Sequence, residues 1–152
     1  QISLRGTIGG RGGNKAAVAI LYNSKVNTLK HLTKFAKYVT SGGLTPEGLA
    51  FEAINKIIMD ERAEDNIFVN YSDGMPYTPE YYGSEAIRHT RKAVDNLRYN
   101  GYKILSFFLS EVYEDDSTKR DFTTMYGKGA SFIEPTNVMM VARDLNNIFL
   151  GK

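Results

Sequence analysis

The stretch YKILSFFLS at residues 102–110 constrains the fold of this chain more than any other feature. Apolar side chains fall on both faces of an extended backbone here. A strand of that kind is buried on both sides, as in a parallel sheet covered by helices. Parallel neighbours need a crossover connection, which is usually a helix. The stretch therefore predicts an α/β fold in which strands and helices alternate.

The rest of the chain shows this alternation. Two strands are predicted at 2–8 and 16–22, around a glycine-rich loop that favours a hairpin over a phosphate or nucleic-acid contact. Further strands are predicted at 66–72, 102–110 and 130–133, and helices at 27–39, 45–58, 84–100 (or from 79), 117–126 and 136–150. The pattern indicates a doubly wound, mostly parallel sheet with helices on both faces, in a single domain over residues 1–152.

Composition narrows the chemistry that the chain can perform. It has 152 residues, a net charge of +2, no cysteine and only two histidines, His31 and His89. Thiolate metal sites, disulfides and cysteine nucleophiles are excluded, so a bound metal would need oxygen ligands. Both histidines fall on polar helix faces, and we assign them no chemistry. The balanced charge disfavours nucleic acid as a partner, and no apolar run approaches the ~18 residues of a membrane span, which predicts a cytoplasmic protein.

Two polar loops are expected to meet at one edge of the sheet, because ligands of open α/β sheets bind beyond the carboxyl ends of the strands. The loop at 41–47 brings the hydroxyl of Thr45, and the strand end at 72–77 brings the carboxylate of Asp73. Both are hard oxygen donors of the kind that Mg²⁺ prefers. Thr45 also fits a helix N-cap before Pro46, and Asp73 fits a turn.

The segments GLTPEGLA at 43–50 and FVNYSDG at 68–74 resemble motifs of the von Willebrand factor A domain. The resemblance implies a metal-ion-dependent adhesion site for Mg²⁺ or Mn²⁺, with Thr45 and Asp73 as ligands. Ser72 and Glu47 would hydrogen-bond around that site, although Glu47 also suits the first turn of a helix.

The family's first metal motif, Asp-x-Ser-x-Ser, does not occur in this chain. In the family it precedes the part that corresponds to residue 2. We therefore expect an N-terminally incomplete domain that lacks the first strand and helix, and a metal site that is incomplete in this chain. The segment SDGMP at 72–76, followed by a helix, is most similar to the group of the cobaltochelatase T subunit. Similar sequences occur in large tailed phages.

The resemblance implies a binding module and not an enzyme. The metal would accept a carboxylate from an acidic residue of a protein partner, and an AAA+ ATPase is the partner that the subgroup suggests. Tyr77, Tyr81 and Tyr82 would form the partner-binding rim or pack the loop.

An assembly protein with a degenerate metal site, in a virion or large complex, is the alternative to a binding module. A phosphoryl-transfer enzyme is less favoured, because no upstream acidic pair accompanies Asp73. If the chain is viral, its location would be the host cytoplasm or the virion.

A basic group on the predicted helix at 84–100 also has two interpretations. Arg88, Arg91, Lys92 and Arg98 recur along this helix. They fit a solvated helix face, with docking of a partner as the alternative.

Overall fold

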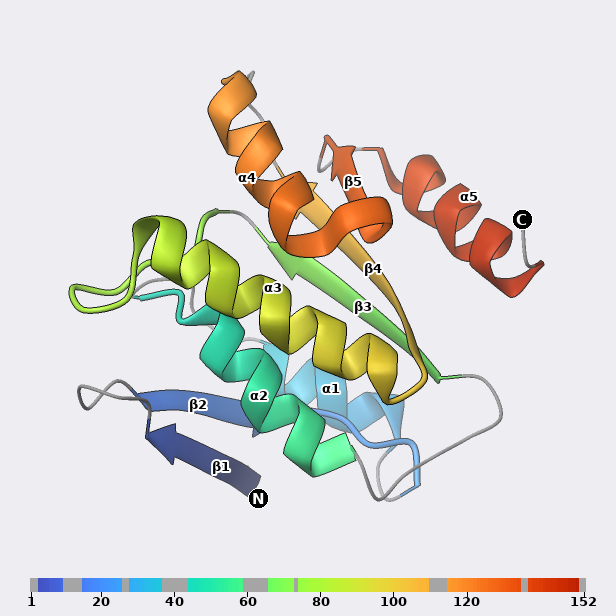
Figure 1. Cartoon of the computed structure of the whole chain (residues 1–152). Helices are drawn as coiled ribbons and strands as arrows, with labels where there is room; N and C mark the ends of the chain where they lie inside the picture. Colours follow the sequence, from blue (N-terminus) through green and yellow to red (C-terminus); the bar gives the residue numbers. More distant parts are fainter. Residues whose placement is uncertain are drawn as a thin grey trace.

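The computed structural model describes residues 3–9, 15–25, 28–36, 44–58, 66–72, 74–109, 115–134 and 137–150. Its main sheet contains three parallel strands in the order β3 (Asn66–Ser72), β4 (Tyr102–Leu109) and β5 (Ala130–Ile133). The central strand β4 is the hydrophobic stretch from which the fold was predicted. The α/β class and the parallel pairing are thereby confirmed, and the arrangement is compatible with a Rossmann-like fold (Figure 1).

The first two strands form a sheet of their own. β1 (Ser3–Gly9) pairs antiparallel with β2 (Lys15–Ile20), as a hairpin requires. Within the described parts of the chain, no strand pairing joins this hairpin to β3–β5. The structure therefore differs from the single mostly parallel sheet that we expected. Contacts with α2, one of the helices described next, hold the hairpin in place.

The helices lie close to the predicted ranges. They are α1 (Leu29–Ala36), α2 (Glu47–Ile58), α3 (Gly83–Tyr99), α4 (Asp116–Tyr126) and α5 (Val138–Phe149), with a short 3₁₀ turn, η1 (Gly127–Gly129), after α4. α2 and α3 pack side by side (Figure 1). Across the described residues, no helix has the length and apolar character needed to cross a membrane.

Alternation along β4 divides the interior into two cores. Ile104 and Phe108 face α3 and α4, where Phe122 and Tyr126 are fully buried. Leu105 and other side chains of the opposite face pack against α5. Helices therefore cover both faces of the sheet, which explains why β4 is apolar on both sides.

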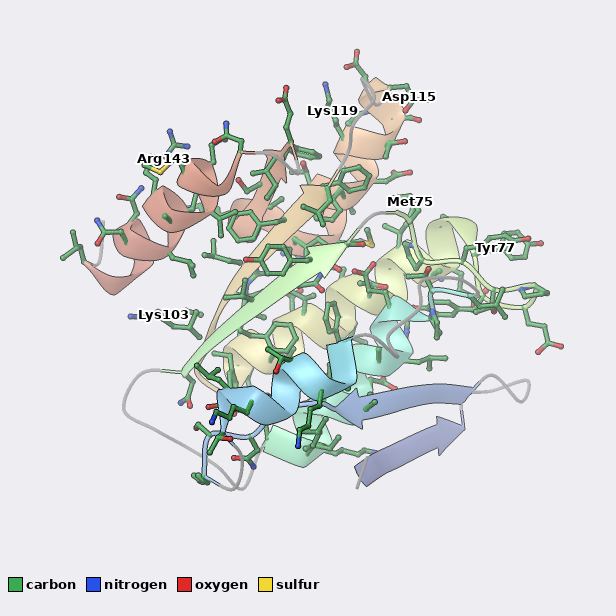
Figure 2. The ribbon with its side chains drawn as sticks, turned by 180° about the vertical axis from the view of Figure 1, so that it is seen from behind. Met75, Tyr77, Lys103, Asp115, Lys119 and Arg143 are labelled. Atoms are coloured by element: carbon green, nitrogen blue, oxygen red, sulfur yellow. The ribbon has the colours of Figure 1, made fainter. Side chains whose placement is uncertain are left out.

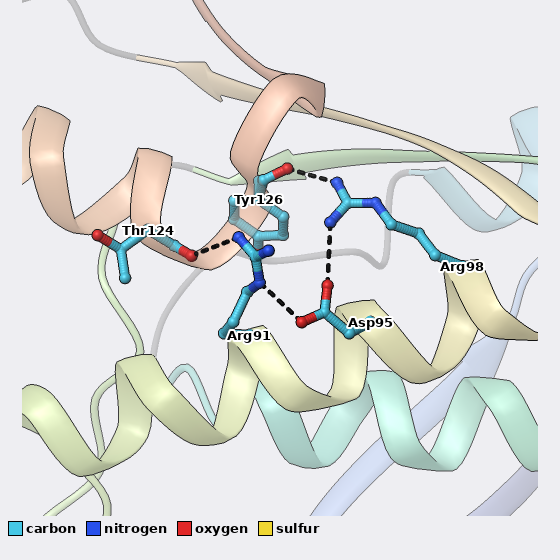
Figure 3. A network of polar contacts seen from close by, with 5 residues as sticks. All are labelled: Arg91, Asp95, Arg98, Thr124 and Tyr126. Atoms are coloured by element: carbon cyan, nitrogen blue, oxygen red, sulfur yellow. Dashed lines mark hydrogen bonds and ion pairs between the residues drawn. The ribbon is translucent and has the colours of Figure 1, made fainter.

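Two arginines of α3 secure the end of α4 (Figure 3). Arg91 Nη1 donates to the carbonyl oxygen of Thr124 at 3.1 Å, and Arg98 Nη2 donates to that of Tyr126. Asp95 accepts from both guanidinium groups, at 2.8 and 3.3 Å. The last carbonyls of a helix lack intrahelical donors and favour a nearby positive charge. Arg91 and Arg98 are therefore not only part of a solvated face, because they join α3 to α4.

Gly129 offers a test of how closely η1 packs on β4. A Cβ atom at this position would overlap the carbonyl oxygen of Ile104, which is backbone and cannot rotate away. We expect Gly129→Ala to lower the free energy of unfolding by about 1–3 kcal/mol, as overpacking does. Urea denaturation measures this change in the free energy of unfolding. Gly74→Ala is the control, because its Cβ would meet nothing within 4 Å. Equal stability of the two variants would contradict the packing described.

Asp115 should make stability depend on pH in the acid range. It is the N-cap of α4, and its carboxylate accepts from Thr118 N at 2.8 Å and from Ser117 Oγ at 2.7 Å. These bonds lower the pKa of Asp115 from 3.8 to about 2. Because the folded-state pKa is the lower one, the stabilisation is present above pH 3.8 and is lost as the pH falls towards 2. The stability difference between wild type and Asp115→Ala should therefore shrink over that interval in urea titrations. A constant difference would contradict this.

Candidate functional site

The two loops predicted to meet at the carboxyl edge of the sheet are joined by backbone hydrogen bonds. Thr45 N donates to Tyr77 O at 2.8 Å, and Tyr77 N donates to Thr45 O at 2.9 Å. Met75 and Tyr77 lie beyond the carboxyl end of β3 (Figure 2). The loop that carries Thr45 is thus fixed beside the segment that follows Ser72.

Ser72 braces the turn after β3. Its side chain is buried, and Oγ donates to the carbonyl oxygen of Gly74 at 2.9 Å. Asp73, the predicted metal ligand between these residues, lies outside the described residues. Thr45 and Ser72 both line a groove of about 810 Å³ that runs along β3 and the start of α2. Glu47 lines it as well, so three of the predicted site residues share one concave surface.

The buried side chain of Glu47 connects α2, β3 and α4 at this groove. It is 7% exposed, and its Oε1 accepts from the side-chain amide of Asn70 at 3.1 Å. The same amide donates to the hydroxyl oxygen of Tyr126 at 3.2 Å. Burial raises the pKa of Tyr126 well above its ordinary value, and so does the nearby carboxylate of Glu47, which is hydrogen-bonded to the phenol. We define Glu47, Asn70 and Tyr126 as the buried polar triad. It connects the first turn of α2, strand β3 and the last turn of α4.

Of the three residues in the triad, only Glu47 is indicated by the sequence patterns. Glu47 was expected to hydrogen-bond near the site or to complement a helix dipole, and Asn70 and Tyr126 were not singled out. Asn70 is the residue that could have indicated this buried contact from the sequence. It occupies the same face of β3 as Phe68, where a buried strand normally carries an apolar side chain. A polar residue there needs a partner.

The three tyrosines predicted for the rim separate into two groups. Tyr77 and Tyr82 are exposed, and their rings lie 6.3 Å apart. Tyr81 turns inward instead, and its hydroxyl lies 2.9 Å from His89 Nδ1 and 3.2 Å from Thr90 Oγ1. Burial raises the pKa of Tyr81 above its ordinary value. Tyr81 therefore packs the loop, whereas Tyr77 and Tyr82 are exposed to solvent.

His89 has a structural role that the sequence did not reveal. Its Nε2 lies 3.1 Å from Glu52 Oε1, on the neighbouring helix α2. In the neutral ring with its proton on Nε2, the imidazole donates to Glu52, and its Nδ1 then shares the one hydroxyl proton of Tyr81 with the carbonyl oxygen of Ala86, which lies 3.2 Å from that hydroxyl. The chain Tyr81–His89–Glu52 thus links the loop, α3 and α2. Its members lie far apart in the sequence, so helical periodicity placed His89 on a polar face without indicating this contact.

Gly48 allows the close approach of α2 to this chain. A Cβ atom on Gly48 would overlap the Tyr81 hydroxyl and lie 2.6 Å from His89 Nδ1. A side chain at position 48 would therefore displace Tyr81 and His89 from the positions in which they contact each other.

Comparison with known proteins adds no family to this picture. Neither a scan against protein-family models nor a search of curated proteins gives a match for this chain. The residues and their geometry therefore carry the functional argument.

The buried polar triad can be tested with Tyr126→Phe. Removing the hydroxyl leaves the Glu47 carboxylate and the Asn70 amide short of a buried partner, and we expect a loss of about 1–3 kcal/mol in the free energy of unfolding. Tyr99→Phe is the matched control, because Tyr99 is 91% exposed. Chemical denaturation of both variants measures their free energies of unfolding. If Tyr126→Phe is as stable as Tyr99→Phe, the triad does not stabilise the packing of α2, β3 and α4.

Proposed function

We propose that this chain is a metal-ion-dependent protein-binding module of the von Willebrand factor A type. The observation that carries the proposal is the pair of backbone hydrogen bonds between Thr45 and Tyr77. It holds a threonine loop against the segment that follows a Ser-Asp-Gly strand end, at the carboxyl edge of a parallel sheet. Two short motifs, separated by about two dozen residues in the sequence, are thus brought together as such a site requires.

The donor set of the groove suits Mg²⁺ or Mn²⁺. Thr45, Ser72 and Glu47 line it and carry side-chain oxygen atoms, and no sulfur or imidazole donor is among its lining residues. Thr45 and Asp73 would hold the ion. Ser72 gives its hydroxyl hydrogen to Gly74, so its oxygen lone pairs remain to accept hydrogen bonds around the site. When bound, the ion supplies an open coordination position for a carboxylate.

The remaining ligands would come from the Asp-x-Ser-x-Ser motif that the resemblance implies. Such a segment would fit along β3. Within the described part of the chain β3 pairs only with β4, so its other edge has no strand partner there. The groove on that side is also lined by Ile20, at the end of β2, and by Phe51 of α2. A further strand would find backbone partners and apolar walls there.

The partner would be a protein that offers an acidic residue, and an AAA+ ATPase is the candidate that the resemblance suggests. The function is reversible docking without a chemical reaction. Tyr77 and Tyr82 support this proposal, because exposed aromatic side chains beside a site serve as anchors for a partner.

Metal binding is tested by titrating Mn²⁺ in a calorimeter into the longest available form of the protein that contains this chain, because Thr45 and Asp73 alone do not complete the ligand shell of the ion. We expect saturable binding, weakened at least about tenfold in Thr45→Ala and in Asp73→Ala, because each removes an oxygen ligand. Asp116→Asn is the control: it removes an exposed carboxylate in the first turn of α4, outside the groove, and should leave the isotherm unchanged.

Identical heats for wild type and Asp73→Ala would overturn the metal-dependent proposal. That outcome would favour the alternative role in a structural assembly. Thermal unfolding of each variant separates loss of binding from loss of the fold.

A further inference from the structure

A second hollow lies on the other side of α2 from the groove. It has a volume of about 890 Å³ and is formed by α2, the turn at 79–82 and the start of α3. Its size is in the range of sites that hold small molecules or side chains. Leu49 and Pro79 give it apolar walls, and Tyr82 adds an aromatic one. We refer to it as the α2–α3 cavity.

The α2–α3 cavity is acidic although the protein carries a net charge of +2. Glu52, Glu80 and Glu85 line it, and its lining includes no lysine or arginine. Glu52 is engaged with His89, whereas Glu80 and Glu85 form no ion pair within the described part of the chain. Glu85 lies in the first turn of α3, where the helix dipole favours a carboxylate. Two negative charges therefore stay available to an occupant.

The aromatic wall favours a cationic occupant as well. Tyr82 is 61% exposed, and the centroid of the Tyr77 ring lies 6.3 Å from that of Tyr82. A guanidinium group attracts and stacks on such a ring face. In the regions that the structure describes, no three acidic or histidine side chains converge as the ligands of a metal ion would. The carboxylates instead border the cavity from three separate segments, which suits an extended organic cation.

We propose that the α2–α3 cavity binds an arginine side chain of a partner protein. The aliphatic part of the arginine packs on Leu49 and Pro79, and its guanidinium group lies over Tyr82 between Glu80 and Glu85. Arginine fits better than lysine because its planar group pairs with carboxylates and stacks on an aromatic ring at the same time. This inference goes beyond the proposed metal-dependent docking and requires no metal ion.

The test is an NMR titration of the ¹⁵N-labelled protein with Nα-acetyl-arginine amide in the presence of EDTA. Saturable shifts are expected at the amides of 80–85 and of His89. Nα-acetyl-citrulline amide has nearly the same shape without the charge, and it should cause no saturable shift. The double variant Glu80→Gln/Glu85→Gln should weaken binding of the arginine probe by about tenfold or more, since each exposed ion pair contributes up to about fivefold.

Glu134→Gln is the matched control, because it removes an exposed carboxylate after β5, far from the cavity in the fold. It should bind the arginine probe like the wild type. Equal shifts with citrulline, or unchanged affinity in the double variant, would overturn the proposal. So would shifts that spread over the surface without saturation. Because EDTA removes free metal ions, the result does not depend on the metal site, and either proposal can fail without the other.

Discussion

The hydrogen bonds of one buried carboxylate determine how the carboxyl edge of the parallel sheet is built. Glu47 is almost entirely removed from solvent, and a buried carboxylate is costly unless hydrogen-bond donors surround it. Asn70 on β3 and Tyr126 at the end of α4 meet part of that requirement, although Oε2 of Glu47 is buried without a hydrogen-bond partner in the described part of the chain. Because Glu47 opens α2, these bonds fix the start of that helix against the sheet. Thr45, two residues earlier, is held in place as a consequence.

The loop after β3 is secured independently at both of its ends. Ser72 and the bridge between Thr45 and Tyr77 hold the first part, next to the carboxyl edge of the sheet. Tyr81 holds the last part through His89, and Gly48 leaves the space that this contact needs. Tyr77 takes part in the first of these contacts and Tyr82 directly follows Tyr81, and both side chains are exposed. Exposed aromatic side chains on an ordered backbone would lower the entropic cost of binding a partner.

The groove and the α2–α3 cavity are joined through this segment. Tyr77 is bonded to Thr45, which lines the groove, and it packs on Tyr82, which lines the cavity. The two proposals together describe a partner with two complementary charges. An acidic side chain would reach the metal, and an arginine would enter the cavity close by. Opposite charges at a defined spacing give specificity and orientation more than they give affinity.

Much of the fold was accessible from local patterns. The stretch at 102–110 indicated a parallel strand buried on both faces, and β4 is that strand. Helices α2 to α5 lie within a few residues of their predicted ranges, because each carries an apolar stripe and recognisable ends, such as Gly101 after α3. The separation of the β1–β2 hairpin from the parallel sheet was not predicted, since strand periodicity does not encode which strand becomes the neighbour.

By itself, the sequence determined an α/β chain without cysteine, and it placed Thr45 and Ser72 at helix and strand ends near one edge of the sheet. Only the tertiary structure decided that Glu47 is buried with Asn70 and Tyr126, and that His89 links Tyr81 to Glu52. It also directed Arg91 and Arg98 to the end of α4. The reason is physical. Periodicity reports which face of an element is buried, but the partner of a polar side chain depends on how elements far apart in the sequence pack.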